Sequence, residues 1–473
     1  MLKQLRIQNF KGWKDTGTIR MAPITLFFGA NSSGKSSIGQ FLMLLKQTVE
    51  SQDRKAVFFT GNEKSAVELG SFRTMVFQRN PLKKIEFQYC WTLPEPLKIN
   101  DPVSEKRFSG NVIAFKATAG LTDSIEQIPS INDFSYTLFS GDQQILKVSL
   151  EKQPDGKNGF GQYHTVAEQY NLVRQKGRPW AFKEVIRFYG FPDEMVAYHQ
   201  NADFVQDMSL THENLFRSIS YLGPLRTKAK RLYHWWDTKP ESVGYSGEHT
   251  VAAILASRKR KIVLSSKPRR ALPFEEIIAL KLKEMGLIDE FKVSPIAEAR
   301  QEYEVKIRTK GADNWVDLPD VGFGISQVLP VLVQCFYAPA NSIIIMEQPE
   351  IHLHPSAQSA LADVMIDVIN SRENGKNRNI QLIIETHSEH FLKRLQRRIA
   401  EEAIAQDAVS AWFANITTTP ASLEPLQIDS FGNILNWPDN FFGDEMGDIA
   451  AHAKAALKKR MQLQVNEKPE MLE

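Results

Sequence analysis

The stretch Gly29-Ala30-Asn31-Ser32-Ser33-Gly34-Lys35-Ser36 fits the pattern G-x-x-x-x-G-K-S/T, a loop whose backbone N–H groups cradle phosphates. It follows an apolar run at residues 24–28 that is typical of a buried strand, and it precedes an apolar-rich run at 38–45 that is typical of a helix. In this strand–loop–helix order, Lys35 reaches the phosphates of a nucleotide and the Ser36 hydroxyl is a ligand of Mg²⁺. We therefore expect ATP and Mg²⁺ as cofactors and a binding loop formed by Gly29, Asn31, Ser33, Gly34, Lys35, Ser36 and Ser37.

Three later segments place polar residues where such a site needs them. Residues 321–327 (Val-Gly-Phe-Gly-Ile-Ser-Gln) lead small residues into an expected helix, which predicts a second anion site at its N-terminus; a plain glycine loop is the alternative. Residues 343–346 are apolar and end in Glu347, a carboxylate placed to hold Mg²⁺ beside the loop serine. Glu385-Thr386-His387 follow the apolar residues 383–384, and we expect His387 to donate a hydrogen bond to a γ-phosphate.

Composition and charge bound the remaining functions. The 473 residues are 42% hydrophobic and 24% charged, as in ordinary globular domains. No apolar run reaches the roughly 18 residues that a membrane helix needs, and the N-terminus lacks the apolar core of a signal peptide. The two cysteines lack metal-ligand spacing, and the histidines of the Ile351–Pro355 segment suit a tight loop better than a zinc site. We expect a cytoplasmic protein without membrane segments.

The order of expected elements suggests one α/β core built from both chain ends and split by an insertion. Strands are expected at 2–10, 24–28, 87–91, 112–115, 134–139, 145–150, 302–308, 343–346 and 380–384, and helices at 35–49, 181–189, 212–220, 273–290, 326–337, 356–370 and 449–465. No heptad pattern predicts a long coiled coil. We divide the chain into an N-terminal lobe with a β-rich arm (1–155), a mixed helical insertion (156–300), a C-terminal lobe (301–400) and a tail (401–473).

Together these segments resemble the ABC-type ATPase heads of the SMC, RecF and OLD group. Residues 321–327 are similar to a degenerate signature motif, Glu347-Gln348 to the Walker B pair, and His387 to the switch histidine. The phrases at 220–226, 347–355 and 437–442 resemble a narrower branch, the bacterial AAA-family ATPases with a C-terminal tail domain of unknown function. This branch lies close to the ATPase subunits of Septu-type phage-defence systems. The resemblance implies an ABC-type P-loop head with a mixed central sheet and flanking helices.

The resemblance also implies a mechanism in which two heads sandwich ATP. Gly324, Ser326 and Gln327 would reach the γ-phosphate bound to the other head, and Gln78 is our candidate for the glutamine beside the metal. The usual Walker B pair is Asp-Glu, whereas Gln348 cannot accept a proton, although it can orient a water. Glu350 is the candidate base, and slow hydrolysis is expected. The protein would then act as a nucleotide-gated clamp or sensor.

The partners implied are a second copy of the chain and a separate nuclease, of the HNH type in the systems that the chain resembles. Only 86 residues follow His387 and they contain no Asp-x-Asp, so we expect no intrinsic nuclease; the acidic cluster at 444–448 is typical of a helix N-terminus. A RecF-like DNA-repair ATPase and an ATP-binding scaffold without hydrolysis are the alternative functions.

A basic run is the candidate surface for duplex DNA, with a solvated face as the alternative. It comprises Arg258, Lys259, Arg260 and Lys261, followed by Lys267, Arg269 and Arg270, with Arg226, Lys228, Lys230 and Arg231 nearby in sequence.

Overall fold

The structure is a computed structural model of the chain. It describes residues 1–121, 128–152, 163–177, 182, 184–268, 270–298, 300–415, 420–438, 441 and 445–466.

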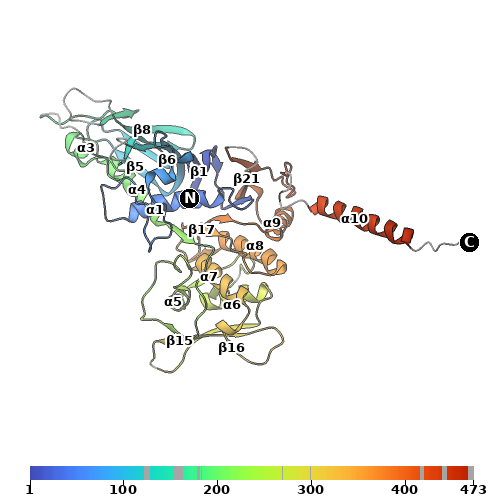
Figure 1. The fold of residues 1–473 in the computed structure, drawn as a ribbon. Coiled ribbons are helices and arrows are strands. Elements are labelled where there is room, and N and C mark those ends of the chain that lie inside the picture. The colour runs from blue at the N-terminus through green and yellow to red at the C-terminus, as the bar shows by residue number, and fades with distance from the viewer. Residues whose placement is uncertain are drawn as a thin grey trace, which may run out of the picture.

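A six-stranded mixed sheet forms the core of the molecule (Figure 1). Its order is β10-β17-β20-β4-β21-β22, with the first five strands parallel and β22 antiparallel to β21. The strands are β10 (Ile219–Leu222), β17 (Ile343–Glu347), β20 (Gln381–Glu385), β4 (Ile24–Gly29), β21 (Val409–Asn415) and β22 (Ser422–Leu426). The P-loop strand β4 therefore lies beside β20, and β20 separates it from β17. The expected mixed α/β fold built from both chain ends is confirmed.

Helices cover both faces of this sheet, which is why its central strands are apolar throughout. Ile343 and Ile345 pack into one core with α1 (Lys35–Glu50) and α4 (Phe204–Arg217). Ile344 and Met346 face the opposite core, formed with α7 (Phe323–Tyr337), α8 (Pro355–Ile369) and α9 (Glu389–Ala400). The alternation of side chains along β17 thus fills both cores.

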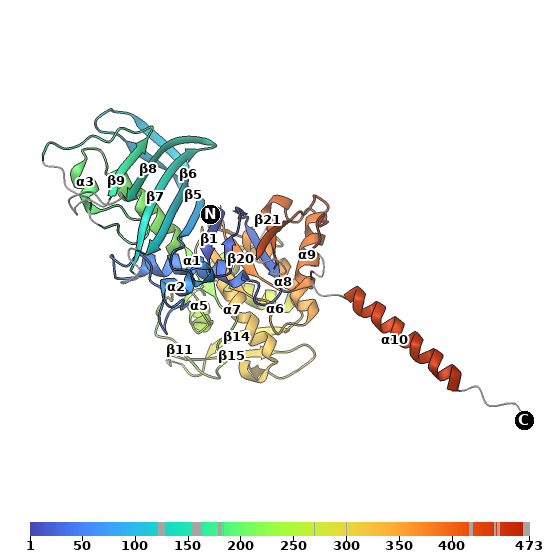
Figure 2. The ribbon, with the colours of Figure 1, turned by 45° about the horizontal axis from the view of Figure 1, so that its top comes forward.

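The β-rich arm is an antiparallel sheet that follows chain order from β5 to β9 (Figure 2). Its strands are β1 (Leu2–Phe10), β2 (Trp13–Asp15), β3 (Ile19–Arg20), β5 (Ile85–Asn100), β6 (Arg107–Leu121), β7 (Pro129–Ser140), β8 (Gln143–Lys152) and β9 (Tyr163–Glu168). The expected domain boundary at 155 is displaced, because β9 pairs with β8 and continues the arm.

A buried histidine joins the arm to the core. His212 of α4 contacts the Tyr89 hydroxyl at 2.6 Å and the Tyr136 hydroxyl at 2.7 Å through its two ring nitrogens. Complete burial lowers the pKa of His212 well below its ordinary value, so the ring is neutral. Because α4 runs directly into β10, the arm is anchored at the edge of the core sheet.

The segment expected as an insertion departs from the prediction in two places. The helix expected at 181–189 is absent from the described residues of that range, where Ile186 and Gly190 form a bridge around a turn; α3 (Asp193–Tyr198) follows it. The same segment supplies β10 to the core sheet, so 156–300 is not a separate insertion. Its remaining elements are β11 (Tyr233–His234), α5 (Thr250–Ala256), β12 (Lys261–Val263), β13 (Ala271–Pro273), α6 (Phe274–Glu284) and β14 (Glu290–Pro295).

Smaller elements complete the described chain: α2 (Phe72–Met75), η1 (Phe77–Arg79), β15 (Glu302–Arg308), β16 (Val316–Asp317), η2 (Leu318–Asp320), β18 (Arg372–Glu373), β19 (Lys376–Asn377) and η3 (Gln406–Ala408). The expected C-terminal helix is present as α10 (Glu445–Asn466), which extends away from the other elements in Figures 1 and 2. None of the described helices combines the length and apolar character that a membrane crossing requires.

Candidate nucleotide-binding site

The loop between β4 and α1 has the backbone shape that its glycines predict. Gly29 has φ of 139°, and a Cβ atom there would lie 2.5 Å from the carbonyl oxygen of Ala414 on β21. Gly34 caps the N-terminus of α1 with φ of 89°, a left-handed conformation that favours glycine. The N–H groups of the first turn of α1 therefore open toward the loop, an arrangement that favours anions.

Lys35 is buried inside this loop. Its Nζ donates hydrogen bonds to the carbonyl oxygens of Gly29 at 3.0 Å and Ala30 at 2.7 Å, and lies 4.0 Å from a carboxylate oxygen of Glu385. Burial lowers the pKa of Lys35, and the charge of Glu385 opposes that shift. The lysine thus brings a positive charge to the loop, as binding of a triphosphate requires.

The other predicted loop residues differ in their exposure. Asn31 is exposed, Ser33 is buried beneath the loop, and the half-buried Ser36 contacts the Glu385 carboxylate. The Ser37 hydroxyl donates to the carbonyl of Gly34 and accepts a hydrogen bond of 2.9 Å from Trp13 Nε1. Ser37 therefore fixes the loop from below, and its contact with a nucleotide stays a prediction.

Two carboxylates meet at the same edge of the sheet. Glu347 and Glu385 are the final residues of β17 and β20, and they are paired in register across these parallel strands. Glu347 Oε1 accepts a hydrogen bond of 2.9 Å from the Tyr221 hydroxyl. Burial, followed by the charge of Glu385, raises the pKa of Glu347 to about 7, and burial also raises the pKa of Glu385. Two buried carboxylates held together create a demand for positive charge.

Glu385 was not predicted as a site residue, although its position resembles that of Glu347. Both end an apolar strand, and parallel strands bring their carboxyl ends to one edge. Gln348, which follows Glu347, donates its backbone N–H to the carbonyl oxygen of Glu385 at 2.8 Å. The signal was therefore present in the sequence as a charged residue at the end of a second apolar run.

Glu350 and His387 link the loops that follow these two strands. Glu350 Oε1 accepts the backbone N–H of His387 at 2.8 Å, and burial raises the pKa of Glu350. Burial and the nearby Lys35 charge lower the pKa of His387. The neutral imidazole keeps an N–H for donation, and its Nε2 has no hydrogen-bond partner among the described residues. The roles of Glu350 as a base and of His387 as a phosphate ligand stay predictions.

Residues of the segment 220–226 form hydrogen bonds with the end of the strand that carries Glu347. Tyr221 on β10 holds the Glu347 carboxylate, while Arg226 donates through Nη2 to the carbonyl oxygens of Glu347 at 3.2 Å and Gln348 at 3.3 Å. Arg226 is only 8% exposed, and burial lowers its pKa to about 10, with the charge of Glu350 opposing the shift. Both residues fix the strand end, and neither was predicted as a site residue.

The predicted signature segment begins α7. A Cβ atom at Gly324 would lie 2.7 Å from the carbonyl oxygen of His352, so the glycine allows this close packing. Phe323 is 51% exposed and its ring lies 4.8 Å from that of His352. The Ser326 hydroxyl donates to the carbonyl of Phe323 at 2.8 Å, and Gln327 is buried. The exposed residues of the segment are thus Gly322 and Phe323, whereas Ser326 is buried like Gln327.

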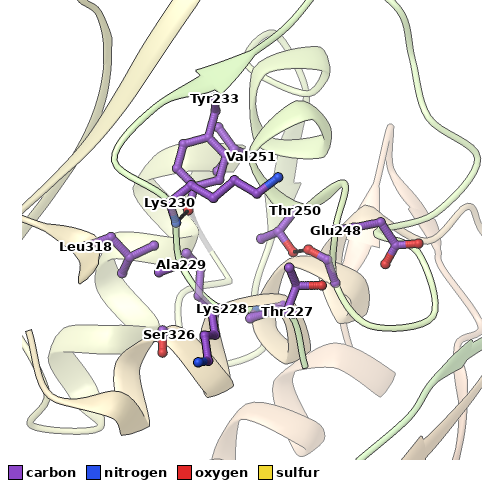
Figure 3. A pocket seen from close by; sticks show the side chains of 13 residues that line it. Thr227, Lys228, Ala229, Lys230, Tyr233, Glu248, Thr250, Val251, Leu318 and Ser326 are labelled. Carbon is purple, nitrogen blue, oxygen red and sulfur yellow. Dashed lines mark hydrogen bonds between the residues drawn. The ribbon is translucent and has the colours of Figure 1, made fainter. Parts of the chain in front are cut away.

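A small recess adjoins this segment (Figure 3). Ser326 lies on one side of it, and the side chains of Lys228 and Lys230 border it. No described acidic group forms an ion pair with either lysine, in contrast to Arg231, which pairs with Asp317 and Asp320. The recess places positive charge beside the predicted signature serine.

The remaining predicted residues have other environments. Gln78 is exposed in η1 with φ of 57°, and its Oε1 accepts from Lys83 at 3.3 Å; its role beside the metal stays a prediction. His354 Nδ1 caps α8 by accepting from the Ser356 N–H, as a tight loop predicts. Among the described residues, no three histidine, cysteine or acidic side chains come together in a group that could hold a metal ion. Of the acidic cluster at 444–448, residue 444 and the side chains at 445–448 lie outside the described part.

The basic run is partly consumed by internal contacts. Arg260 pairs with Glu373 at 2.8 Å and donates to the carbonyl of Tyr337, and Arg258 donates to the carbonyl of Val293. Arg258, Lys259 and Lys261 are exposed, and Arg258 also pairs with Glu275 at 3.5 Å, so the role of this run in DNA binding stays a prediction. Arg269 lies outside the described residues.

Comparison with known proteins agrees with this geometry. The model of an AAA ATPase domain matches residues 1–204 and 259–392, well over half of the chain. The chain belongs to the AAA ATPase domain family. A second model, of a protein of unknown function (DUF3696), matches residues 404–451. None of the curated proteins is detectably similar in sequence.

Solved structures of SMC heads are similar over most of their length. The SMC head domain from Thermotoga maritima has 11% identity and a TM-score of 0.38, covering 90% of this chain and 99% of that chain. An SMC head bound to the C-terminal winged-helix domain of ScpA has 11% identity and a TM-score of 0.39, covering 91% and 98%. An SMC head with an extended coiled coil, bound to the C-terminal domain of ScpA from Pyrococcus furiosus, has 11% identity and a TM-score of 0.41, covering 90% and 96%.

Proposed function

We propose that this protein binds ATP with Mg²⁺, hydrolyses it slowly, and forms a nucleotide-dependent oligomer that regulates a partner nuclease in antiphage defence. The observation that carries the ATPase proposal is the meeting of Lys35, Ser36, Glu347, Glu385 and His387 at one edge of the core sheet. These groups supply a cation, a hydroxyl, two carboxylates and a neutral imidazole, a donor set that fits Mg·ATP. Bound Mg²⁺ would neutralise charge on the phosphates.

Slow hydrolysis follows from the residues around the expected attacking water. Gln348 can orient a water but cannot take its proton. Glu350 is buried, and one of its oxygens is occupied by the His387 N–H. A base so enclosed is reached by water only when the two loops separate, so we propose that the ATP-bound state is long-lived.

The nuclease partner and the defence role rest on the resemblance of the sequence to Septu-type ATPase subunits. The match of the tail to DUF3696 supports membership of that branch, because the branch carries such a tail. In those systems the partner is of the HNH type. We propose that the nucleotide-dependent oligomer is the form of the protein that regulates this partner.

ATP turnover by the purified protein tests the ATPase proposal. We expect slow phosphate release by the wild type and loss of it in Lys35→Ala, measured alone and with duplex DNA. Undiminished turnover in Lys35→Ala would contradict the proposal. Adding the nuclease encoded beside the gene, if there is one, then tests whether its cutting depends on Lys35.

Oligomer formation is tested through the exposed signature segment. In the proposed ATP sandwich, Gly324, Ser326 and Gln327 of one head would reach the nucleotide of the other, and the exposed Phe323 begins the same helix. Phe323→Asp should therefore abolish the mass increase that the non-hydrolysable analogue AMP-PNP causes in light scattering. Phe431→Asp, at a more exposed phenylalanine of the tail, is the matched control and should leave it intact. An unchanged mass of the wild type on addition of AMP-PNP would refute the sandwich.

A further inference from the structure

We infer that Glu385 is a third protein group of the Mg²⁺ site, acting with Ser36 and Glu347. This inference rests on the proposed ATP binding and extends it to a residue for which the signature motifs assign no role. It follows from the position of β20 between the other two strands of the site.

The position of Glu385 is fixed by the sheet. β20 pairs with β4 on one side and with β17 on the other, and Glu385 is opposite both Phe27, two residues before the P-loop glycine, and Glu347. Its carboxylate lies 4.0 Å from Lys35 Nζ and contacts Ser36. Glu385 therefore reaches the two P-loop side chains that bind phosphate and metal.

The burial of Glu385 points in the same direction. Its side chain is only 11% exposed, and its Oε2 has no hydrogen-bond partner among the described groups. A buried carboxylate oxygen without a partner is unfavourable unless a ligand satisfies it. Mg²⁺ is held in nucleotide sites by one or two carboxylates with the substrate phosphates, which is the number that Glu347 and Glu385 provide.

The neighbouring Walker B position explains why this carboxylate matters here. Gln348 carries no charge, so the usual second acidic group after β17 is missing. The backbone N–H of Gln348 is bonded to the carbonyl oxygen of Glu385 at 2.8 Å, so the two residues are direct neighbours. The second carboxylate of the site is therefore present, but on the adjacent strand.

Mn²⁺ binding followed by electron paramagnetic resonance, in the presence of AMP-PNP, tests the inference without relying on turnover. We expect Glu385→Gln to weaken Mn²⁺ binding at least tenfold, as we also expect for Glu347→Gln. Glu389→Gln, four residues further along the chain in the first turn of α9, is the matched control and should bind Mn²⁺ as the wild type does.

The affinity for AMP-PNP in EDTA separates this role from a structural one. Glu385→Gln should bind the metal-free analogue at least as tightly as the wild type, because a negative charge near the phosphates is removed. Mn²⁺ affinity within twofold of the wild type, or loss of metal-free binding, would overturn the inference while leaving the ATP site in place. Failure of the wild type itself to bind AMP-PNP would refute the proposed function.

Discussion

The buried carboxylate Glu347 should make the ligand-free protein less stable at high pH. Its pKa in the folded state is about 7, against 4.5 for an ordinary glutamate. Between these values the folded protein keeps a proton that the unfolded chain has released, so stability falls as pH rises through this window. Below pH 4.5 both states are protonated and the penalty vanishes; above pH 7 it is complete.

The magnitude follows from the size of the shift. A difference of one pKa unit corresponds to about 1.4 kcal/mol, so the shift of Glu347 destabilises the folded state by about 3 kcal/mol at pH 8. Glu347→Gln removes the charge, while its amide oxygen still accepts the hydrogen bond from Tyr221. The variant should be about 3 kcal/mol more stable than the wild type at pH 8 and nearly equal to it at pH 4.5. The site would thus be less stable without a cation than with one.

Urea unfolding, monitored by hydrogen exchange in peptides that cover β17 and β20, measures this difference in the free energy of unfolding. All other titrating groups are common to both proteins, so the difference between them isolates the pair of carboxylates. Equal stability at pH 8, or a less stable variant, would refute the electrostatic reasoning.

Three further predictions concern the frame of the site. Gly29→Ala should lower stability by about 2 kcal/mol and abolish nucleotide binding, because its Cβ would meet the Ala414 carbonyl at 2.5 Å; Gly12→Ala, with nothing within 4 Å, should be nearly neutral in thermal melts. Asp367→Ala should lower the free energy of urea unfolding by about 3 kcal/mol, because Lys281, 1% exposed, loses its buried partner. Glu284→Ala, at the exposed partner of the same lysine, should lower it by under about 1 kcal/mol. Equal losses in the two variants would contradict this reasoning. The double variant Lys259→Glu/Lys261→Glu should weaken duplex DNA binding and flatten its salt dependence, and an unchanged salt slope would assign the run to a solvated surface.

The sequence predicted the parts of the site that are encoded locally. The P-loop, Glu347 and His387 each lie where a strand ends, and the hydrophobic runs before them marked β4, β17 and β20. Tyr221 and Arg226 were missed as site residues because their partners lie more than 120 positions away, and no local pattern pairs them. For the same reason the sequence did not show that Arg260 of the basic run pairs with Glu373, 113 residues later.

The arm boundary shows a second limit. β8 and β9 are paired strands, but no local periodicity in the sequence marks this pairing. The composition alone therefore favoured a boundary at 155. Likewise, β10 has four residues, too few for the sequence to mark it as part of a core sheet, although β10 forms one edge of that sheet. Long-range pairing, and not local propensity, decided both.

Calorimetric titration of AMP-PNP with Mg²⁺ into the wild type and Lys35→Ala tests the central claim most directly, namely that the edge formed by β4, β20 and β17 is an Mg·ATP site. We predict saturable binding by the wild type and at least a tenfold loss of affinity in Lys35→Ala. Equal affinity of the two proteins, or no binding by a folded wild type, would contradict the account.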